Sequence, residues 1–361
     1  MPSSTDAIKL RALLRARLDF CKRELETLLS LLQYASTSPR LEPFSHRLQM
    51  HGINLLSEVS RMLLNLELPD DGILPDVLSD TGRIVREARF LHQRLAAPVL
   101  RHSPEDEIPL KVVLWLHDQH PRTAGIPAAC TVGDMSILPV QVAPIYFMPS
   151  LEGRGLLYLA LIFHEYGHLI FALYRDEMRD LIEEFQQVIE SGLQQLSGRN
   201  DYYSEQHSGL SKAISERWFE WTHEFFCDAI GLHLGGAAYL HAFSSYVHFL
   251  DPYDYVAEPN DLQKSTHPLS WMRIRLLAER ARRLGLGNEA DDVECEWKTV
   301  LDQLQVDEDY HGYFDDSLQS HLQNTLDDML TCADFEPTVL AFGLAPANCE
   351  EAWIIDRSLL F

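Results

Sequence analysis

The sequence predicts an α+β fold that is predominantly helical. Apolar residues recur at helical spacing along most of the 361 residues, and turn signals rich in Pro, Asp and Gly separate these stretches. Only the segment 110–148 is rich in β-forming residues. We therefore expect an N-terminal helical bundle over 1–108, a central α+β domain over 109–285, and a C-terminal helical extension with a tail over 286–361.

The N-terminal bundle is predicted from three helical segments, 5–36, 43–66 and 82–97. The first follows a Ser-Thr-Asp cap and carries leucines at helical spacing, namely Leu10, Leu13, Leu14, Leu18, Leu25, Leu28, Leu29 and Leu32. Such leucine stripes are typical of helix faces that pack in a bundle core. The turn-rich residues 102–109 are expected to link this bundle to the central domain.

A small mixed sheet is predicted within 110–148. Residues Lys111–Leu116 form a β-rich run, and 131–148 contain one or two further strands. Prolines at 139 and 144 favour edge strands, because proline cannot donate to a ladder. We expect this sheet to pack on a central helix and to offer an edge to an extended peptide, with the identity of the edge strand left open. His117 and His120 are predicted to be exposed loop histidines.

The remainder is predicted to be helical. Segments at helical spacing lie near 176–196, 209–234, 237–249, 268–284, 288–304 and 314–332. The tail from Pro337 is irregular, and its apolar residues, including Trp353, are expected to dock on the body.

The stretch His164-Glu165-Tyr166-Gly167-His168 indicates a metal site. Histidines four residues apart on a helix share a face, so both imidazoles can reach one zinc ion about 2.0–2.1 Å away. Glu165 flanks that face. Residues 155–174 are otherwise apolar, which predicts a buried helix whose ionisable side chains need partners. The alternative to a metal site is a pair of core histidines that form hydrogen bonds to carbonyl groups. A membrane-spanning helix is disfavoured, because His164, Glu165 and His168 lie in the middle of the apolar segment.

The third ligand is predicted on a later helix. In one arrangement of zinc ligands, the third ligand is a histidine six residues after the second histidine, with Gly three residues after that second histidine. Here Phe171 and Tyr174 occupy these two positions, so this arrangement is excluded. Instead, Glu224 is followed four residues later by Asp228, which can orient a ligand histidine. Glu220 shares the Glu224 face and is the competing ligand, while His223 is predicted to point to another face.

With these residues the chain resembles the gluzincin zinc metallopeptidases. The segment Ser265–Ile274, which reads Ser-Thr-His-Pro followed by Arg-Ile, is similar to one in the prenyl-protein endopeptidases and their bacterial heat-shock relatives. The resemblance implies a zincin-like catalytic domain with one Zn²⁺ held by His164, His168 and Glu224. It also implies Glu165 as general base, Asp228 behind the ligands, His267 stabilising the oxyanion, and Arg273 in a structural ion pair. Those relatives are membrane proteins, so lipidated or membrane substrates are not carried over.

His267 can be examined independently of the resemblance. A residue before proline favours extended backbone, so His267 should lie in a loop ahead of a helix that Pro268 begins. His267 can present a hydrogen-bond donor to a cleft or form only a local hydrogen bond.

In the expected mechanism, Glu165 takes a proton from metal-activated water and later passes it to the leaving amine.

Composition limits the class of partner. The net charge of −24 without a clustered basic face makes nucleic acid an improbable partner. Six cysteines lack paired spacing, which predicts free thiols in a reducing compartment, and the N-terminus carries no signal-peptide pattern. We expect a cytoplasmic protein that does not insert into membranes and acts on peptide or protein substrates.

Three functional hypotheses follow from the sequence. The first is an active zinc peptidase, most simply an endopeptidase. The second is a zinc hydrolase that acts on a non-peptide amide or another small substrate. The third is a catalytically inactive helical interaction protein with a structural zinc site, which a fourth ligand such as His223 or Asp228 would support.

Overall fold

The structure is a computed structural model that describes residues 4–35, 38–139, 143–149, 157–197, 204–306, 308, 310–311, 313–314 and 316–335. The chain divides into two compact units. Unit 1 comprises Met1–Asp134 and Val140–Ser150, and unit 2 comprises Met135–Pro139 and Leu151–Phe361. The three-part division at 108 and 285 stays a prediction beside this two-unit division.

Helices dominate both units, and three short strands form a small mixed sheet in the order β1-β3-β2. The predicted predominantly helical fold with a small mixed sheet is thus confirmed. No helix in the described part of the chain is both long enough and apolar enough to cross a membrane.

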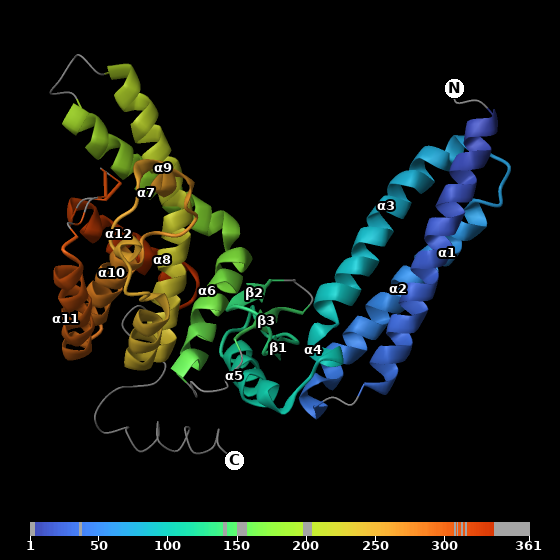
Figure 1. The fold of residues 1–361 in the computed structure, drawn as a ribbon, viewed down its shortest axis with the longest axis horizontal. Coiled ribbons are helices and arrows are strands. Elements are labelled where there is room, and N and C mark those ends of the chain that lie inside the picture. The colour runs from blue at the N-terminus through green and yellow to red at the C-terminus, as the bar shows by residue number, and fades with distance from the viewer. Residues whose placement is uncertain are drawn as a thin grey trace. The chain divides into compact units, whose positions relative to one another are not determined.

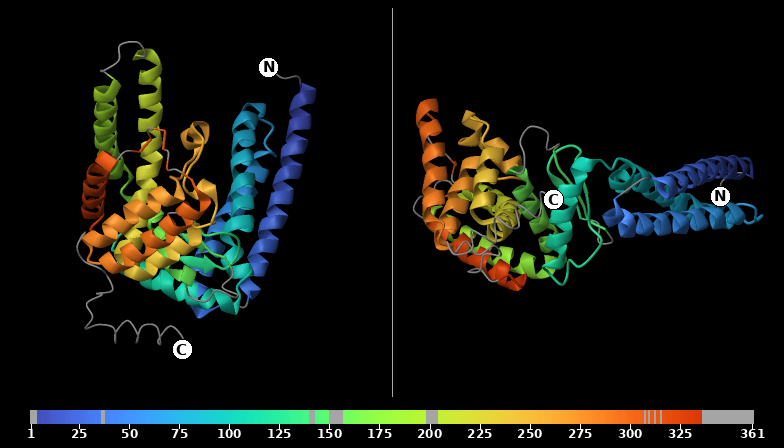
Figure 2. Two further views of the ribbon diagram at one scale, coloured as in Figure 1. Left: turned by 60° about the vertical axis from the view of Figure 1, so that its left-hand side comes forward. Right: turned by 90° about the horizontal axis from the view of Figure 1, so that it is seen from below.

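Unit 1 contains a helical bundle made of α1 (Ser4–Tyr34), α2 (Glu42–Asn65) and α3 (Leu74–Phe90), which lie alongside one another (Figures 1 and 2). Buried leucines and other apolar side chains line their shared interior, among them Leu18, Leu25, Leu48, Val59 and Ile84. The leucine stripe predicted from the sequence is therefore partly core-facing, although Leu13 is 56% exposed.

The remaining elements of unit 1 come after the helical bundle in the sequence. It contains α4 (Ala97–Leu100), α5 (Glu107–Asp118), β1 (Ala128–Cys130) and β3 (Ile145–Phe147). The two strands pair in parallel, with Ala129 opposite Tyr146.

The predicted strand at Lys111–Leu116 is wrong, because these residues belong to helix α5. Ser103 and Asp106 form a capping box just ahead of it, which stabilises a helix start. Leu110, Val113 and Leu116 are buried at helical spacing, so tertiary packing overrides their β propensity. The prediction for His117 and His120 is also wrong, since both are buried.

Unit 2 is built around a pair of packed helices, α6 and α8. It contains β2 (Ser136–Leu138), the 3₁₀ segment η5 (Leu157–Leu161), α6 (Ile162–Leu173), α7 (Arg175–Ser197), α8 (Ser204–Val247), α9 (Pro259–Lys264), α10 (Ser270–Arg283), α11 (Gly287–Leu304) and α12 (Asp316–Cys332). Its core gathers aromatic side chains from α8, α10 and α11, including Tyr239, Phe243, Trp271 and Trp297.

Helix α8 contains a break at Gly236, whose φ of 54° and ψ of −137° lie outside the helical region. Only glycine adopts such a backbone without strain, which explains why the predicted segments 209–234 and 237–249 meet here. The predicted docking of the tail from Pro337 lies outside the described residues.

Candidate metal centre

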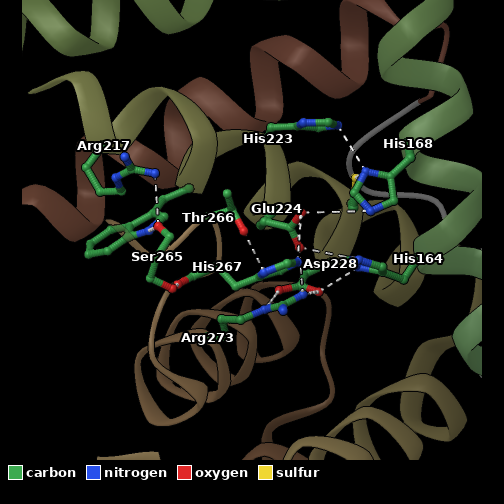
Figure 3. Close-up of polar contacts among 12 residues, drawn as sticks. His164, His168, Arg217, His223, Glu224, Asp228, Ser265, Thr266, His267 and Arg273 are labelled. Atoms are coloured by element: carbon green, nitrogen blue, oxygen red, sulfur yellow. Dashed lines mark hydrogen bonds and ion pairs between the residues drawn. The ribbon is translucent and has the colours of Figure 1, made fainter. Parts of the chain in front are cut away.

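Helix α6 carries His164, Glu165 and His168 into the interior of unit 2, where it packs against α8. Figure 3 shows His164 and His168 facing Glu224. Gly167 makes this close approach possible. A Cβ atom added to Gly167 would lie 2.7 Å from the Cα atom of Cys227 on α8. The glycine inside the motif thus brings the two helices near enough for side chains of α8 to reach both histidines.

Glu224 lies between the two histidines of the motif. Its Oε2 atom is 3.5 Å from Nε2 of His164, and its Oε1 atom is 3.8 Å from Nε2 of His168. Oε2 is buried and has no hydrogen-bond partner. Burial raises the pKa of Glu224, but the neighbouring His164 and Arg273 outweigh burial and lower it. The carboxylate is therefore ionised, and Oε2, which is 3.4 Å from Nη2 of Arg273, has a charged neighbour but no hydrogen bond.

Asp228, one turn further along α8, orients His164 from behind. Its Oδ1 atom lies 2.9 Å from Nδ1 of His164 and accepts a hydrogen bond of 3.0 Å from the Tyr239 hydroxyl. Arg273 of α10 donates to both carboxylate oxygens, at 2.9 and 2.7 Å. Burial opposes ionisation of Asp228, but Arg273 and His164 lower its pKa. The arrangement fixes the His164 ring and turns Nε2 toward Glu224.

Tyr239 can reach Asp228 only because α8 has glycine at 231. A Cβ atom there would lie 2.3 Å from the Tyr239 ring. Tyr239 is fully buried, so its hydroxyl needs a partner, and Asp228 supplies one.

His168 contacts other groups through its second ring nitrogen. Nδ1 lies 3.1 Å from Nε2 of His223 and 3.3 Å from Sγ of Cys227. The His223 ring stacks on Phe171, with centroids 3.8 Å apart. His223 was predicted to point to another face than Glu224; it meets His168 at Nδ1, whereas Glu224 lies toward Nε2.

The protonation of the histidines follows from their surroundings. Burial lowers the pKa of His168 to about 3 and that of His223 to about 4, so both rings are neutral. For His164, burial also lowers the pKa, but the hydrogen bond to Asp228 and the nearby Glu224 carboxylate outweigh it and raise the pKa to about 9. A metal that binds Nε2 of His164 replaces the proton held there.

Glu165 is 7% exposed and accepts a hydrogen bond from the backbone N–H of Ile137 in β2. Burial raises its pKa, and the charge of His164 partly offsets this rise. A carboxylate whose affinity for a proton is raised in this way is suited to accept one during a reaction.

His267 and Glu220 occupy different positions at this site. Nε2 of His267 lies 3.6 Å from Oε1 of Glu224, Nδ1 lies 3.1 Å from the Thr266 hydroxyl, and the side chain is 61% exposed. Glu220 is exposed and lines the same cavity, without a described contact to either motif histidine. The structure therefore brings Glu224, and not Glu220, to His164 and His168.

These groups open into a cavity of about 920 Å³ in unit 2. His164, Glu165, His168, His223, Glu224 and His267 lie along its wall, and the β2 residues Ser136 and Ile137 border it. The cavity joins a buried carboxylate, two histidine nitrogens and a strand of the sheet in one space.

The spacing between Glu224 and each histidine can be compared with that of zinc ligands. Ligand atoms about 2.0–2.1 Å from a tetrahedral zinc lie about 3.3–3.4 Å from one another. Oε2 of Glu224 lies 3.5 Å from Nε2 of His164, which is close to this value, and the other oxygen, Oε1, lies 3.8 Å from Nε2 of His168. The unsatisfied Oε2 atom of Glu224 gains a partner when a cation binds there.

A second donor set shares both histidines. Possible ligand atoms of His164, His168 and Cys227 all lie within 4.8 Å of one another. Cys227 reaches His168 on the Nδ1 side, whereas Glu224 faces Nε2 of both rings. Burial and then the carboxylates of Glu224 and Asp228 raise the pKa of the Cys227 thiol, which disfavours the thiolate that a metal needs. The physical chemistry thus favours Glu224 over Cys227.

Sequence reasoning missed the contacts of Cys227 and Tyr239. Cys227 stands three residues after Glu224, a spacing that places it on a neighbouring side of the helix and could have drawn attention to it. No sequence signal pointed to Tyr239, because its position depends on the break in α8 and on Gly231.

Comparison with known proteins gives no relative. No family model, no curated protein and no solved structure matches this chain.

Proposed function

We propose that the protein is a zinc-dependent peptidase with a zincin-like catalytic core. His164, His168 and Glu224 hold one Zn²⁺, and Glu165 is the general base. The observation that carries the proposal is the buried, unsatisfied oxygen of Glu224 facing Nε2 of His164, with Glu165 beside it in the same cavity.

Each residue has a defined task in this proposal. Zinc held by His164, His168 and Glu224 would polarise the scissile carbonyl and would lower the pKa of a bound water to about 7. Glu165 takes a proton from the attacking water and passes it to the leaving amine, as its raised pKa permits. Nε2 of His267 lies at the cavity wall, where an imidazole offsets the charge that develops on the carbonyl oxygen.

The cavity supports a peptide substrate. β2 is an outer strand in the order β1-β3-β2, and Ser136 and Ile137 of β2 border the cavity. An extended peptide can align with such a strand and place its scissile bond against Glu165.

Cys21, Cys130, Cys227 and Cys295 are free thiols. They support a reducing compartment, and we place the protein in the cytoplasm.

The test of the base is Glu165→Gln. This variant should keep its zinc and lose about 10²–10⁴-fold in peptide hydrolysis, because the amide cannot accept the proton. Glu220→Gln makes the same change elsewhere in the cavity and should keep its zinc and hydrolyse an uncharged peptide. Hydrolysis by Glu165→Gln at the wild-type rate would refute the assignment.

The ligands are tested by metal analysis of purified protein. Glu224→Gln should lose stoichiometric zinc, whereas Glu220→Gln and Cys227→Ser should retain it. Zinc that is lost with Cys227 and kept without Glu224 would favour the second donor set, and with it a structural zinc in a catalytically inactive protein.

A second candidate function is hydrolysis of a non-peptide amide. A cavity of about 920 Å³ lies within the range of about 300–1,000 Å³ that is usual for small-molecule sites. A digest of a peptide library separates the two functions, since only a peptidase cleaves it.

A further inference from the structure

The cavity has a cationic end. Arg175 and Arg179, one turn apart at the start of α7, both line the cavity and are both exposed. Side chains four residues apart on a helix lie on one face, so the two guanidinium groups face the same part of the cavity.

The position of this end follows from the packing of α7 against α8. Phe185 of α7 packs edge-on against Trp218 of α8, and Gln186 donates to the backbone carbonyl of Ser215. Nearer the motif, Phe171 stacks on His223. The two helices therefore run in opposite directions, and Arg175 and Arg179 lie level with the stretch of α8 around Glu220.

Neither arginine has a protein partner within the described residues. No hydrogen bond or ion pair joins Arg175 or Arg179 to another described side chain, although other arginines of unit 2, such as Arg273, Arg275 and Arg282, are paired with carboxylates. In a chain with a net charge of −24, two unpaired arginines in one cavity leave a local excess of positive charge. Glu220 lines the same cavity and reduces this excess by one charge without pairing.

The wall around the far end of α8 is apolar. Phe243, Tyr246 and Val247 line the cavity together with Leu161 and Met135. His164 stacks on Phe243, so this apolar wall begins at the metal ligands themselves. The cavity is thus polar and cationic in one direction from the ligands and apolar in the other.

The distance from the ligands sets which part of a substrate meets the arginines. Arg175 follows His168 by seven residues, which corresponds to at most about 10 Å of helical rise, because α6 ends at Leu173 and α7 begins at Arg175. An extended peptide advances about 3.3 Å per residue. The two arginines are therefore expected to meet a part of the substrate within roughly three residues of the scissile bond.

We propose that Arg175 and Arg179 form a carboxylate-binding subsite that selects peptides with an anionic group a few residues to one side of the cleaved bond. This specificity rests on the proposed peptidase function. Guanidinium groups bind carboxylates through paired, charge-assisted hydrogen bonds, and the anionic group is either an acidic side chain or the C-terminal carboxylate of the substrate. Glu220 weakens the subsite by repulsion.

The experiment measures binding and cleavage separately. Fluorescent peptides are titrated against zinc-loaded Glu165→Gln protein, which should bind without cleaving, and the same peptides are digested with active protein. One pair differs only by Glu or Gln at a scanned position, and a second pair differs only by a free or amidated C-terminus. The two pairs distinguish the two sources of the carboxylate.

The acidic member of one pair should bind about tenfold more tightly, with a lower KM and little change in kcat. Arg175→Gln combined with Arg179→Gln should abolish this preference, and Glu220→Gln should increase it. Lys298→Gln removes one positive charge from an exposed position outside the cavity and should leave the preference unchanged. Added salt should weaken the preference, since the guanidinium groups are exposed to solvent.

The possible failures are distinct. Cleavage without any preference between the members of either pair would overturn the subsite and leave the peptidase function standing. Tighter binding of an acidic peptide that is never cleaved, but is lost in the double variant, would support the subsite and overturn the peptidase function. Equal loss of preference in Lys298→Gln would also overturn the subsite, because net charge and not the cavity would then be responsible.

Discussion

Both units of the molecule bury histidines, but they satisfy them differently. In unit 1, Nδ1 of His117 lies 2.8 Å from the Thr123 carbonyl and Nε2 lies 2.8 Å from the Tyr146 hydroxyl. Both ring nitrogens have neutral partners within the fold. In unit 2, Nε2 of His164 faces a carboxylate oxygen that has no hydrogen-bond partner.

The difference separates a structural histidine from a candidate ligand. Burial lowers the pKa of His117 to about 4, so the ring is neutral and donates and accepts one hydrogen bond each. The unit 2 cluster instead gathers Glu165, Glu224 and Asp228 around His164, His168 and Arg273. A fully bonded ring stabilises a fold, whereas buried donor atoms that converge without bonding each other can hold a cation.

The largest expected effect comes from breaking the ion pair behind the ligands. Arg273→Met should destabilise unit 2 by about 3–5 kcal/mol, because it leaves Asp228 buried without its cation. Arg275→Met, two residues along the same helix, removes contacts to Glu308 and to the exposed Asp316 and should cost under about 1 kcal/mol. Chemical denaturation of both variants measures this difference. Equal losses would show that the pair contributes no more than a surface contact.

The structural histidine is tested by pH. The pKa of His117 is about 4 in the folded protein and about 6.5 when unfolded, so between these values the unfolded chain binds the additional proton. Its contribution to stability is therefore complete above about pH 6.5 and is lost as the pH falls toward 4, by about 3 kcal/mol in total.

His117→Gln removes this titration and should flatten the fall in stability over that pH range, although it also costs stability at neutral pH. Denaturant unfolding of both proteins at several pH values measures the slope. A variant whose stability falls as steeply as that of the wild type would contradict the role given to His117.

The smallest expected effects come from two glycines, one in each unit. Gly167→Ala should cost about 1–3 kcal/mol, because the new Cβ would lie 2.7 Å from the Cα atom of Cys227. Gly82→Ala lies in α3 of unit 1, where the nearest atom to the new Cβ is Nη1 of Arg86 at 3.5 Å, so it should stabilise by about 0.5–1 kcal/mol. The two changes should thus move the unfolding midpoint in opposite directions. A stabilising Gly167→Ala would show that α6 and α8 can separate without cost.

Long periodic segments were the part of the fold that the sequence predicted well. The helices at 5–36, 43–66, 176–196 and 288–304 correspond to α1, α2, α7 and α11 with small shifts at their ends. Lys111–Leu116 was predicted wrongly because a short apolar run fits a strand and a buried helix equally well, and the capping box at Ser103 carried the deciding signal.

The candidate site also combines features that the sequence predicts with features that depend on the packing of helices. The spacing within His164–His168 and within Glu224–Asp228 needs only the geometry of one helix, and that geometry is local. The contacts of His223, Cys227 and Tyr239 depend on how closely α6 approaches α8 and on where α8 bends.

The sequence alone determined which residues of each helix share a face, because the helical repeat fixes this within a few turns. It also determined the candidate chemistry, since two histidines and a later glutamate are zinc ligands by type. Only the tertiary structure decided that Glu224 rather than Glu220 meets both histidines, and that two arginines of α7 line the same cavity. The reason is physical: distances between helices are set by side-chain packing between segments far apart in the chain, which no local repeat encodes.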